Sequence, residues 1–164
     1  MTCTQTAETV LIAVGANRGD RHGTILAALD LLARHSRILR ISSFQESVPV
    51  EGVQGGTFLN GAVALQTGVR PDRFLSALQH IEKVLGRPPD HPKYDARTID
   101  LDIILWGRRI WNSSGLKIPH PRFRQRLFVL EPLHEIAPDA IDPITGKTIA
   151  DLYAEVCHAC DPYH

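Results

Sequence analysis

Two acids lie inside an otherwise apolar segment, Thr98-Ile99-Asp100-Leu101-Asp102-Ile103-Ile104-Leu105-Trp106. Its remaining residues are mostly β-branched or aliphatic, which predicts a β-strand. Side chains alternate between the two faces of a strand, so the two aspartates share one face. The opposite face is expected to be buried and consists of Ile99, Leu101, Ile103 and Leu105.

Asp100 and Asp102 are candidate metal ligands. On one strand face their carboxylates lie about 7 Å apart, and their repulsion raises at least one pKa unless a cation sits between them. Oxygen ligands at this spacing suit Mg²⁺, which completes its shell with water and phosphate oxygens. A solvated edge of the sheet is the alternative. The nearby basic residues Arg87, Lys93 and Arg97 favour the metal site, because they indicate an anionic ligand.

The order of the other elements predicts an α+β fold of the ferredoxin-like type. Strands are expected over residues 10–14, 37–50, 57–66 and 98–106, with helices over 24–36 and 71–85. This β-α-β-β-α-β order gives one antiparallel sheet with two helices on one face and the site on the other. A C-terminal extension follows, with helices near 122–126 and 148–156, in layers of the αβα type. Residues 1–164 are expected to form a single domain, with a core over about 10–152 and a frayed tail over 153–164.

Composition and charge are those of an ordinary globular enzyme. The chain has 164 residues, of which 43% are hydrophobic and 22% are charged, and a domain of this size buries roughly two-thirds of its unfolded surface. Eighteen basic residues balance eighteen acidic ones, so the chain lacks the basic excess of a nucleic-acid binder. Residues 1–8 contain no basic run, so neither a signal peptide nor a membrane span is expected. A cytoplasmic location is expected.

Cys157-His158-Ala159-Cys160 has the C-x-x-C spacing of redox pairs and of half a zinc site. A redox pair usually opens a helix after a strand, whereas this one follows the last predicted helix. A zinc site would need two more ligands, which are scattered in the sequence. A reduced pair without a chemical role is therefore expected.

A second basic cluster follows the acidic strand and consists of His120, Arg122, Arg124 and Arg126. Arginine forks bind two phosphate oxygens at once, so two basic clusters around one acidic strand indicate phosphate chemistry. The chain has neither a Walker-type G-x-x-x-x-G-K-[ST] motif nor a kinase Gly-rich loop with an H-R-D triplet. An ATP-using enzyme of another lineage is expected.

Several motifs carry a resemblance to a known family. The most specific are Arg97-Thr-Ile-Asp-Leu-Asp-Ile103 and Pro119-His-Pro-Arg122, in that order. The others are Ile12-Ala-Val-Gly-Ala-Asn17, Ser42-Ser-Phe44, Phe58-Leu-Asn-Gly-Ala-Val63, Leu85-Gly-Arg87, Arg126-Leu-Phe-Val-Leu130 and Pro132-Leu-His-Glu-Ile-Ala-Pro138. With these motifs, the chain resembles the 6-hydroxymethyl-7,8-dihydropterin pyrophosphokinases of folate biosynthesis from Leu11 to about Leu152.

The resemblance implies transfer of the β,γ-pyrophosphoryl unit of ATP to the pterin hydroxymethyl oxygen, which leaves AMP. By the family pattern, Asp100 and Asp102 hold two Mg²⁺ ions and act in catalysis with Arg87 and Arg97. The implied ATP-binding residues are Glu82, Arg87, Lys93, Arg97, His120 and Arg126. The expected partners are ATP and the pterin, without nucleic acid or membrane, and a monomer is expected.

The resemblance also implies a pterin site, formed by Gly15, Ser47, Val48, Val50, Phe58, Asn60 and Phe128. A flat ring requires aromatic faces and a few hydrogen-bonding groups. Phe58, Phe128 and Asn60 can supply them, although both phenylalanines would also suit a hydrophobic core. The turn-rich segments 46–56 and 87–96 border the implied site and are expected to close over bound ATP.

The chain departs from the family pattern at Lys93-Tyr94-Asp95-Ala96, where Gly-Pro usually precedes the Arg-Thr motif. Asp95 adds a negative charge near the incoming phosphates, which bears on the rate rather than on the reaction. Three rival classes are a paralogue that binds without transfer, a ferredoxin-like RNA-binding module and an acylphosphatase-like hydrolase. The RNA-binding module would need an aromatic-and-basic strand motif that the sequence lacks. The hydrolase, built on the loop at Asn17 and Arg18, leaves the aspartates unexplained.

Overall fold

The computed structural model describes residues 8–48, 57–86 and 99–160. The predictions for Val50, Arg87, Lys93 and Arg97 lie outside these residues, as do those for segments 49–56 and 87–96. In the described part of the chain, none of the helices combines the length and the apolar character that crossing a membrane requires.

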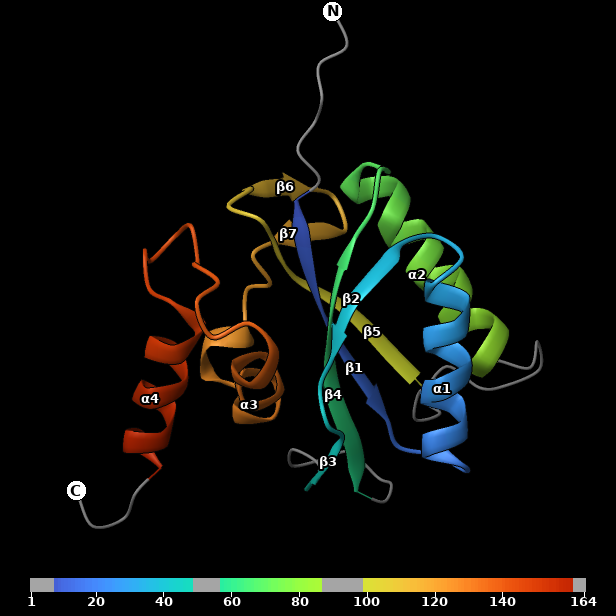
Figure 1. Ribbon diagram of the computed structural model, residues 1–164, viewed down its shortest axis with the longest axis horizontal. Coiled ribbons are helices and arrows are strands. Elements are labelled where there is room, and N and C mark those ends of the chain that lie inside the picture. The colour runs from blue at the N-terminus through green and yellow to red at the C-terminus, as the bar shows by residue number, and fades with distance from the viewer. Residues whose placement is uncertain (1–7, 49–56, 87–98, 161–164) are drawn as a thin grey trace, which may run out of the picture.

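An antiparallel sheet forms the centre of the molecule (Figure 1). The strands β1 (Thr9–Ala16), β2 (Arg37–Ile41), β4 (Phe58–Gln66) and β5 (Ile99–Trp106) lie in the order β2-β4-β1-β5, and the short strand β3 (Gln45–Ser47) also pairs with β4. Every pairing is antiparallel, with β1 between β4 and β5. One helix follows β1 and another follows β4. The predicted ferredoxin-like βαββαβ fold is therefore confirmed.

Helices α1 (Arg21–Leu32) and α2 (Pro71–Gly86) cover one face of the sheet (Figure 1). The Asp20 carboxylate caps α1 by accepting a hydrogen bond from the N–H of Gly23 at 3.0 Å, so this helix begins earlier than predicted. It also ends earlier, at Leu32. The buried ring of Phe74 meets that of Trp106 edge-on, with 5.7 Å between centroids. This core holds the apolar side of β5 and leaves the other side for the two aspartates.

Helix α3 (Leu127–Ile136) lies on the opposite face, and α4 (Ile149–Ala159) packs outside it (Figure 1). The sequence did not predict α3. Its buried residues Val129, Leu130 and Leu133 share a core with Ala62 and Ala64 of β4, because such small residues allow a helix to approach the sheet closely. The layers are of the predicted αβα type, but a helix now shares the face that was expected to carry only the site.

The segment between β5 and α3 starts with a hairpin and ends with a single helical turn. The hairpin pairs β6 (Trp111–Ser113) with β7 (Leu116–Ile118), and the turn is the 3₁₀ helix η1 (Phe123–Gln125). The sequence predicted a short helix at 122–126, close to η1. Phe123 is fully buried in the core under α3, so this segment is fixed against the sheet.

The alternation predicted for β5 holds only as far as Ile103. There the register with β1 shifts, since Leu11 pairs with Leu105 and Ile12 with Ile103, which leaves Ile104 as an extra residue. A bulge of this kind reverses the faces of the residues after it. Leu105 therefore packs with Ile104 in the core on the α3 side, and its predicted place under α1 and α2 is wrong.

The predicted strand 37–50 divides into β2 and β3 at Ser42. The N–H of Ser42 donates to the carbonyl of Ala62 at 2.9 Å, and its hydroxyl accepts from the N–H of Ala62 at 2.8 Å. The Phe44 ring then lies over Gly61 in the space that a Cβ would occupy, so the glycine permits this close crossing. As a result, β3 reaches the end of β4 that carries Asn60.

Helix α4 continues beyond residue 156, where the helix predicted from the sequence ends. It begins with a capping box in which Thr148 and Asp151 exchange hydrogen bonds, and it continues to Ala159. Cys157 lies inside the helix and Cys160 is its C-cap, and both are free thiols.

Candidate functional site

A cavity of about 300 Å³ lies on the α3 side of the sheet. Residues of β1, β4 and β5 form its floor, and the segment from His120 to Val129 contributes its other wall. The lining consists of Ala13, Val14, Gly15, Ser47, Val48, Phe58, Asn60, Gly61, Asp100, Asp102, Ile104, His120, Arg126, Phe128 and Val129. Every residue that the resemblance assigned to the site and that the structure describes belongs to this set except Glu82.

The floor of the cavity is a row across three strands. Gly15 on β1 pairs with Asn60 on one side and with Asp100 on the other. Asn60 and Asp100 are thus two strand spacings apart, roughly 10 Å. Gly15 and the neighbouring Ala13 are small, so the middle of the row stays open. The row separates an acid end, around Asp100 and Asp102, from a ring end, around Asn60.

The acid end fits a hard divalent cation. Both aspartates line the cavity from one face of β5, with Asp100 half-buried and Asp102 exposed. Two carboxylates on one strand face suit Mg²⁺, which prefers oxygen ligands. Within residues 8–48, 57–86 and 99–160, no three His, Cys, Asp or Glu side chains gather to hold a metal ion. Among these residues, Asp100 and Asp102 are the candidate ligands for such an ion.

Glu82, on α2, does not line the cavity. Its Oε1 accepts a hydrogen bond of 2.8 Å from the N–H of Leu101, the residue between the two aspartates. This contact ties α2 to the strand that carries the acid pair. The predicted ATP-binding role of Glu82 stays a prediction.

His120 is held in a defined orientation. Its backbone N–H donates to the carbonyl of Ile104 at 3.0 Å, and the ring Nδ1 accepts from the backbone N–H of Arg122 at 3.1 Å. Nε2 is then the nitrogen that carries the proton of the neutral ring. Burial, followed by the positive charges of Arg126 and Arg122, holds the pKa of His120 below its usual value. His120 therefore offers a hydrogen-bond donor to an anion in the cavity.

Only part of the predicted basic cluster lines the cavity. Arg126 does, with its guanidinium 5.7 Å from the centroid of the Phe128 ring. Arg124 instead forms a paired contact with the fully buried Asp142, with N···O distances of 2.6 and 2.9 Å. Arg122 is exposed and is not part of the lining. A phosphate role for Arg124 is thus not supported by its position.

The Asp142 carboxylate is satisfied on all sides. Burial alone would favour its neutral form, but hydrogen bonds from Arg124, Thr145 and the N–H of Ile144 outweigh it and lower the pKa of Asp142 to about 2. Arg124 precedes Arg126 by two residues. The ion pair therefore fixes the wall of the cavity that carries His120 and Arg126.

The ring end joins polar and aromatic groups. The Nδ2 of Asn60 donates a short hydrogen bond to the Ser47 hydroxyl. The Oδ1 of Asn60 lies over Gly15, where a Cβ would come within 3.1 Å of it, so the glycine keeps this acceptor accessible from the cavity. Phe58 and Phe128 are both half-buried and line the same space.

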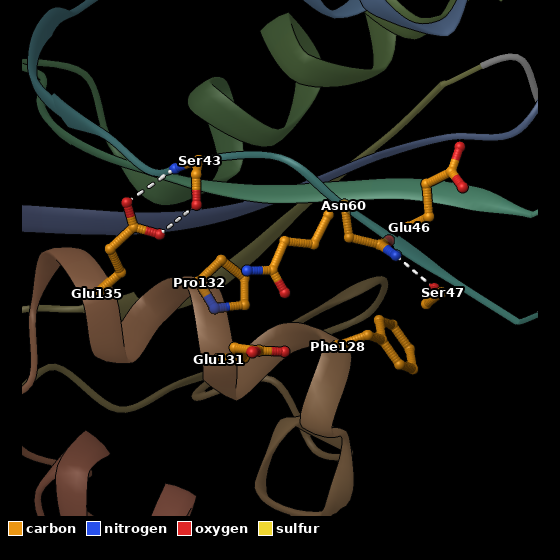
Figure 2. A pocket seen from close by; sticks show the side chains of 9 residues that line it. Ser43, Glu46, Ser47, Asn60, Phe128, Glu131, Pro132 and Glu135 are labelled. Carbon is orange, nitrogen blue, oxygen red and sulfur yellow. Dashed lines mark hydrogen bonds between the residues drawn. The ribbon is translucent and has the colours of Figure 1, made fainter.

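A second pocket of about 30 Å³ adjoins the ring end (Figure 2). It shares Ser47, Asn60 and Phe128 with the main cavity. Its other lining residues are Ser43, Gln45, Glu46, Glu131, Pro132 and Glu135. None of these six residues was predicted to line the site, although several lie within motifs of the resemblance and Glu46 begins the segment 46–56.

Further cavity residues were also missed, namely Ala13, Val14, Gly61, Ile104 and Val129. For Ile104 a signal was present, because it continues the period of two set by Asp100 and Asp102. The others are small or apolar residues that could not be told from core positions in the sequence.

Fold and cavity together define a ferredoxin-like α+β protein with an acid end suited to metal and phosphate and a ring end suited to a flat heterocycle. The chain belongs to the 7,8-dihydro-6-hydroxymethylpterin-pyrophosphokinase family, whose model matches residues 11–138.

Relatives of known name support this membership. A 2-amino-4-hydroxy-6-hydroxymethyldihydropteridine pyrophosphokinase of Bacillus subtilis is 41% identical over 127 residues, which cover 76% of this chain and 75% of that protein. The enzyme of the same name from Pseudomonas aeruginosa is 37% identical, over 88% of this chain and 90% of that protein. The folic acid synthesis protein fol1 of Pneumocystis carinii is 40% identical over 91% of this chain, but the chain spans only 20% of that protein.

The solved structures show the same fold. A Plasmodium falciparum protein described as HPPK-DHPS superposes with a TM-score of 0.78 at 15% identity, over 99% of this chain and 46% of that one. This likeness concerns the fold alone.

Proposed function

We propose that this chain transfers the β,γ-pyrophosphoryl unit of ATP to the hydroxymethyl oxygen of 6-hydroxymethyl-7,8-dihydropterin, with AMP as the second product, in folate biosynthesis. The observation that carries the proposal is the row Asn60-Gly15-Asp100 across the cavity floor. It places groups suited to a pterin and groups suited to a metal-bound polyphosphate in one cavity, roughly 10 Å apart. The names of the relatives point to the same reaction.

In this reaction the hydroxymethyl oxygen attacks the β-phosphorus of ATP. The bond from that phosphorus to the α,β-bridging oxygen breaks, AMP leaves with this oxygen, and the hydroxyl proton is released. Such a transfer requires positioning and charge neutralisation rather than a covalent nucleophile. Two Mg²⁺ ions held by Asp100 and Asp102 would supply much of that neutralisation when bound.

His120 and Arg126 bind the phosphates from the wall formed by the segment from His120 to Val129. Neutral His120 donates from Nε2, since its Nδ1 is already occupied by the N–H of Arg122. Arg126 adds a positive charge and lies beside the Phe128 ring. It therefore stands where the acid end meets the ring end.

At the ring end, Asn60 reads the polar edge of the pterin. Because its Nδ2 already donates to Ser47, its Oδ1 is the atom available to accept from a ring N–H. Phe58 and Phe128 provide apolar faces for the ring. Val48, which is 82% exposed, borders the same space and would be covered by a bound ring.

The roles of Val50, Glu82, Arg87, Lys93 and Arg97 rest on the family pattern and stay predictions. A monomeric state and a cytoplasmic location also stay predictions.

Product analysis tests the proposed reaction. The purified chain, ATP, Mg²⁺ and 6-hydroxymethyl-7,8-dihydropterin should give AMP and pterin diphosphate in equal amounts, and omission of the pterin should abolish AMP formation. Asp102→Ala should lose this activity, whereas Asp72→Ala, which alters an exposed acid on α2, should retain it. Formation of ADP in place of AMP, or of AMP without dependence on the pterin, would overturn the proposal.

A further inference from the structure

A set of contacts joins the strand β3 region to helix α3 beside the ring end (Figure 2). Glu135 on α3 accepts two hydrogen bonds from Ser43, one from its N–H at 2.9 Å and one from its hydroxyl at 2.7 Å. The side-chain amide of Gln45 approaches Glu131, and the amide orientation that satisfies both groups turns its nitrogen toward the carboxylate, 3.2 Å from each oxygen. Two acids of one helix are thus bound to two residues of one extended segment.

The spacing of these contacts matches a helix laid along a strand. The two glutamates are four residues apart, a rise of about 6 Å in a helix, and their partners are two residues apart, a rise of about 6.6 Å in a strand. Farther in the same direction, Ser47 lies two residues beyond Gln45 and Phe128 lies three residues before Glu131, which is also one helical turn. Ser47 and Phe128 line both the main cavity and the small pocket. The contacts therefore continue along the two elements toward the space between Ser47 and Phe128, which we call the slot.

Strand β3 is held by its pairing with β4, by the ion pair of Glu46 with Arg21, and by the contact of Gln45 with α3. In the described part of the chain its three residues pair only with β4. Ser47 on β3 accepts the hydrogen bond from Asn60 that leaves the amide oxygen available in the cavity. A shift of β3 relative to α3 would thus change both the orientation of Asn60 and its separation from Phe128.

We propose that Glu131 and Glu135 are positioning residues for the pterin, because they fix the width of the slot between Ser47 and Phe128. The inference rests on the proposed function, which assigns the pterin to this end of the cavity. A flat ring is sensitive to that width, since dispersion contacts weaken steeply when a gap of even half an ångström opens. The acid end lies across the sheet on β5, so nucleotide binding should not depend on the two glutamates.

Binding measurements on the full chain separate these effects. We would titrate 6-hydroxymethylpterin into the protein saturated with Mg²⁺ and α,β-methylene-ATP, whose methylene group blocks transfer. Glu135→Ala should raise the pterin Kd about tenfold, the equivalent of one hydrogen bond to a charged group. Glu135→Gln keeps one acceptor oxygen, so its pterin Kd should lie between those of the wild type and Glu135→Ala. The Kd of α,β-methylene-ATP should change less than about twofold in both variants.

A matched control is Glu155→Ala. Glu155 lies on α4 and pairs with Lys147, away from the cavity, so its loss should leave the pterin Kd unchanged. Gln45→Ala removes the Glu131 contact from the strand side and leaves α3 intact, so it provides the test if Glu135→Ala fails to fold. It should also weaken pterin binding.

The proposal is overturned if the glutamate and Gln45 variants bind the pterin as the wild type does. It is equally overturned if pterin and nucleotide affinities fall in parallel, because that indicates a general loss of structure. Failure of the wild type itself to bind the pterin would remove the proposed function, and this inference with it. Normal binding by the wild type with unchanged variants would remove this inference alone.

Discussion

The acid end and the ring end of the cavity are built in different ways. Asp100 and Asp102 take their positions from the regular pairing of β5 with β1. At the ring end, Asn60 and Phe128 come from different elements on different layers, and these layers are joined by contacts of Ser43 and Gln45 with Glu135 and Glu131 of α3. The acid pair therefore lies on a single strand within the sheet, whereas the ring end exists only once the sheet and α3 have assembled.

The largest effect is expected at the acid end. Asp102→Ala should lower kcat on the order of a thousandfold or more, because several kcal/mol of stabilisation of the transferring phosphates is lost. The Kd for 6-hydroxymethylpterin should change far less. Steady-state kinetics at saturating Mg²⁺ and ATP, combined with pterin titration, measure both. Near wild-type turnover by this variant would show that the two ends are not specialised as described.

The wall shared by both ends should be sensitive to its buried ion pair. Asp142→Asn leaves Arg124 without its charged partner and should reduce the free energy of unfolding by about 3 kcal/mol. Urea denaturation measures the change. Glu155→Ala, which removes a surface ion pair with Lys147, should cost about 0.5 kcal/mol or less. Equal losses in the two variants would mean that Asp142 contributes no more than a surface acid.

A smaller effect is expected at the ring end. Phe128→Ala should raise the pterin KM about thirtyfold, or about 2 kcal/mol, because the ring loses an aromatic face. Its kcat at saturating pterin should stay within a few-fold of the wild type, since the aspartates are untouched. Should kcat fall as far as in Asp102→Ala, the separation between the ends would be lost.

The last effect depends on pH. The folded-state pKa of Asp142 is lowered to about 2 from an ordinary value of 3.8. Its ion pair thus adds stability above pH 4, and this stability is lost as the pH falls toward 2. The difference in unfolding free energy between the wild type and Asp142→Asn should shrink over that range. A constant difference from pH 6 to pH 2 would contradict the assignment.

Local pattern explains why the acid end could be predicted from the sequence. Alternation of aliphatic and acidic residues over 99–103 placed both carboxylates on the same face of β5, the face that lines the cavity. The bulge at Ile104 could not be predicted, because it depends on how β1 pairs with β5. The partner of Arg124 was equally hidden, since Asp142 is distant in the sequence and lies in a loop.

Helix α3 illustrates the limit of pattern more clearly. Pro132 lies inside it and lacks the N–H that a helix interior needs, so a local interpretation disfavours a helix there. Tertiary burial of Val129, Leu130 and Leu133 against β4 stabilises it nonetheless. Because Glu131 and Glu135 take their positions from this helix, their contacts with Gln45 and Ser43 could not be predicted.

A crystal structure with Mg²⁺, α,β-methylene-ATP and 6-hydroxymethylpterin tests the two-ended cavity most directly. We expect metal bound by Asp100 and Asp102, phosphates between them and the pair His120 and Arg126, and the pterin ring against Phe128. Phosphates bound away from the aspartates, or a ring outside the slot at Phe128, would contradict the assignment of the two ends.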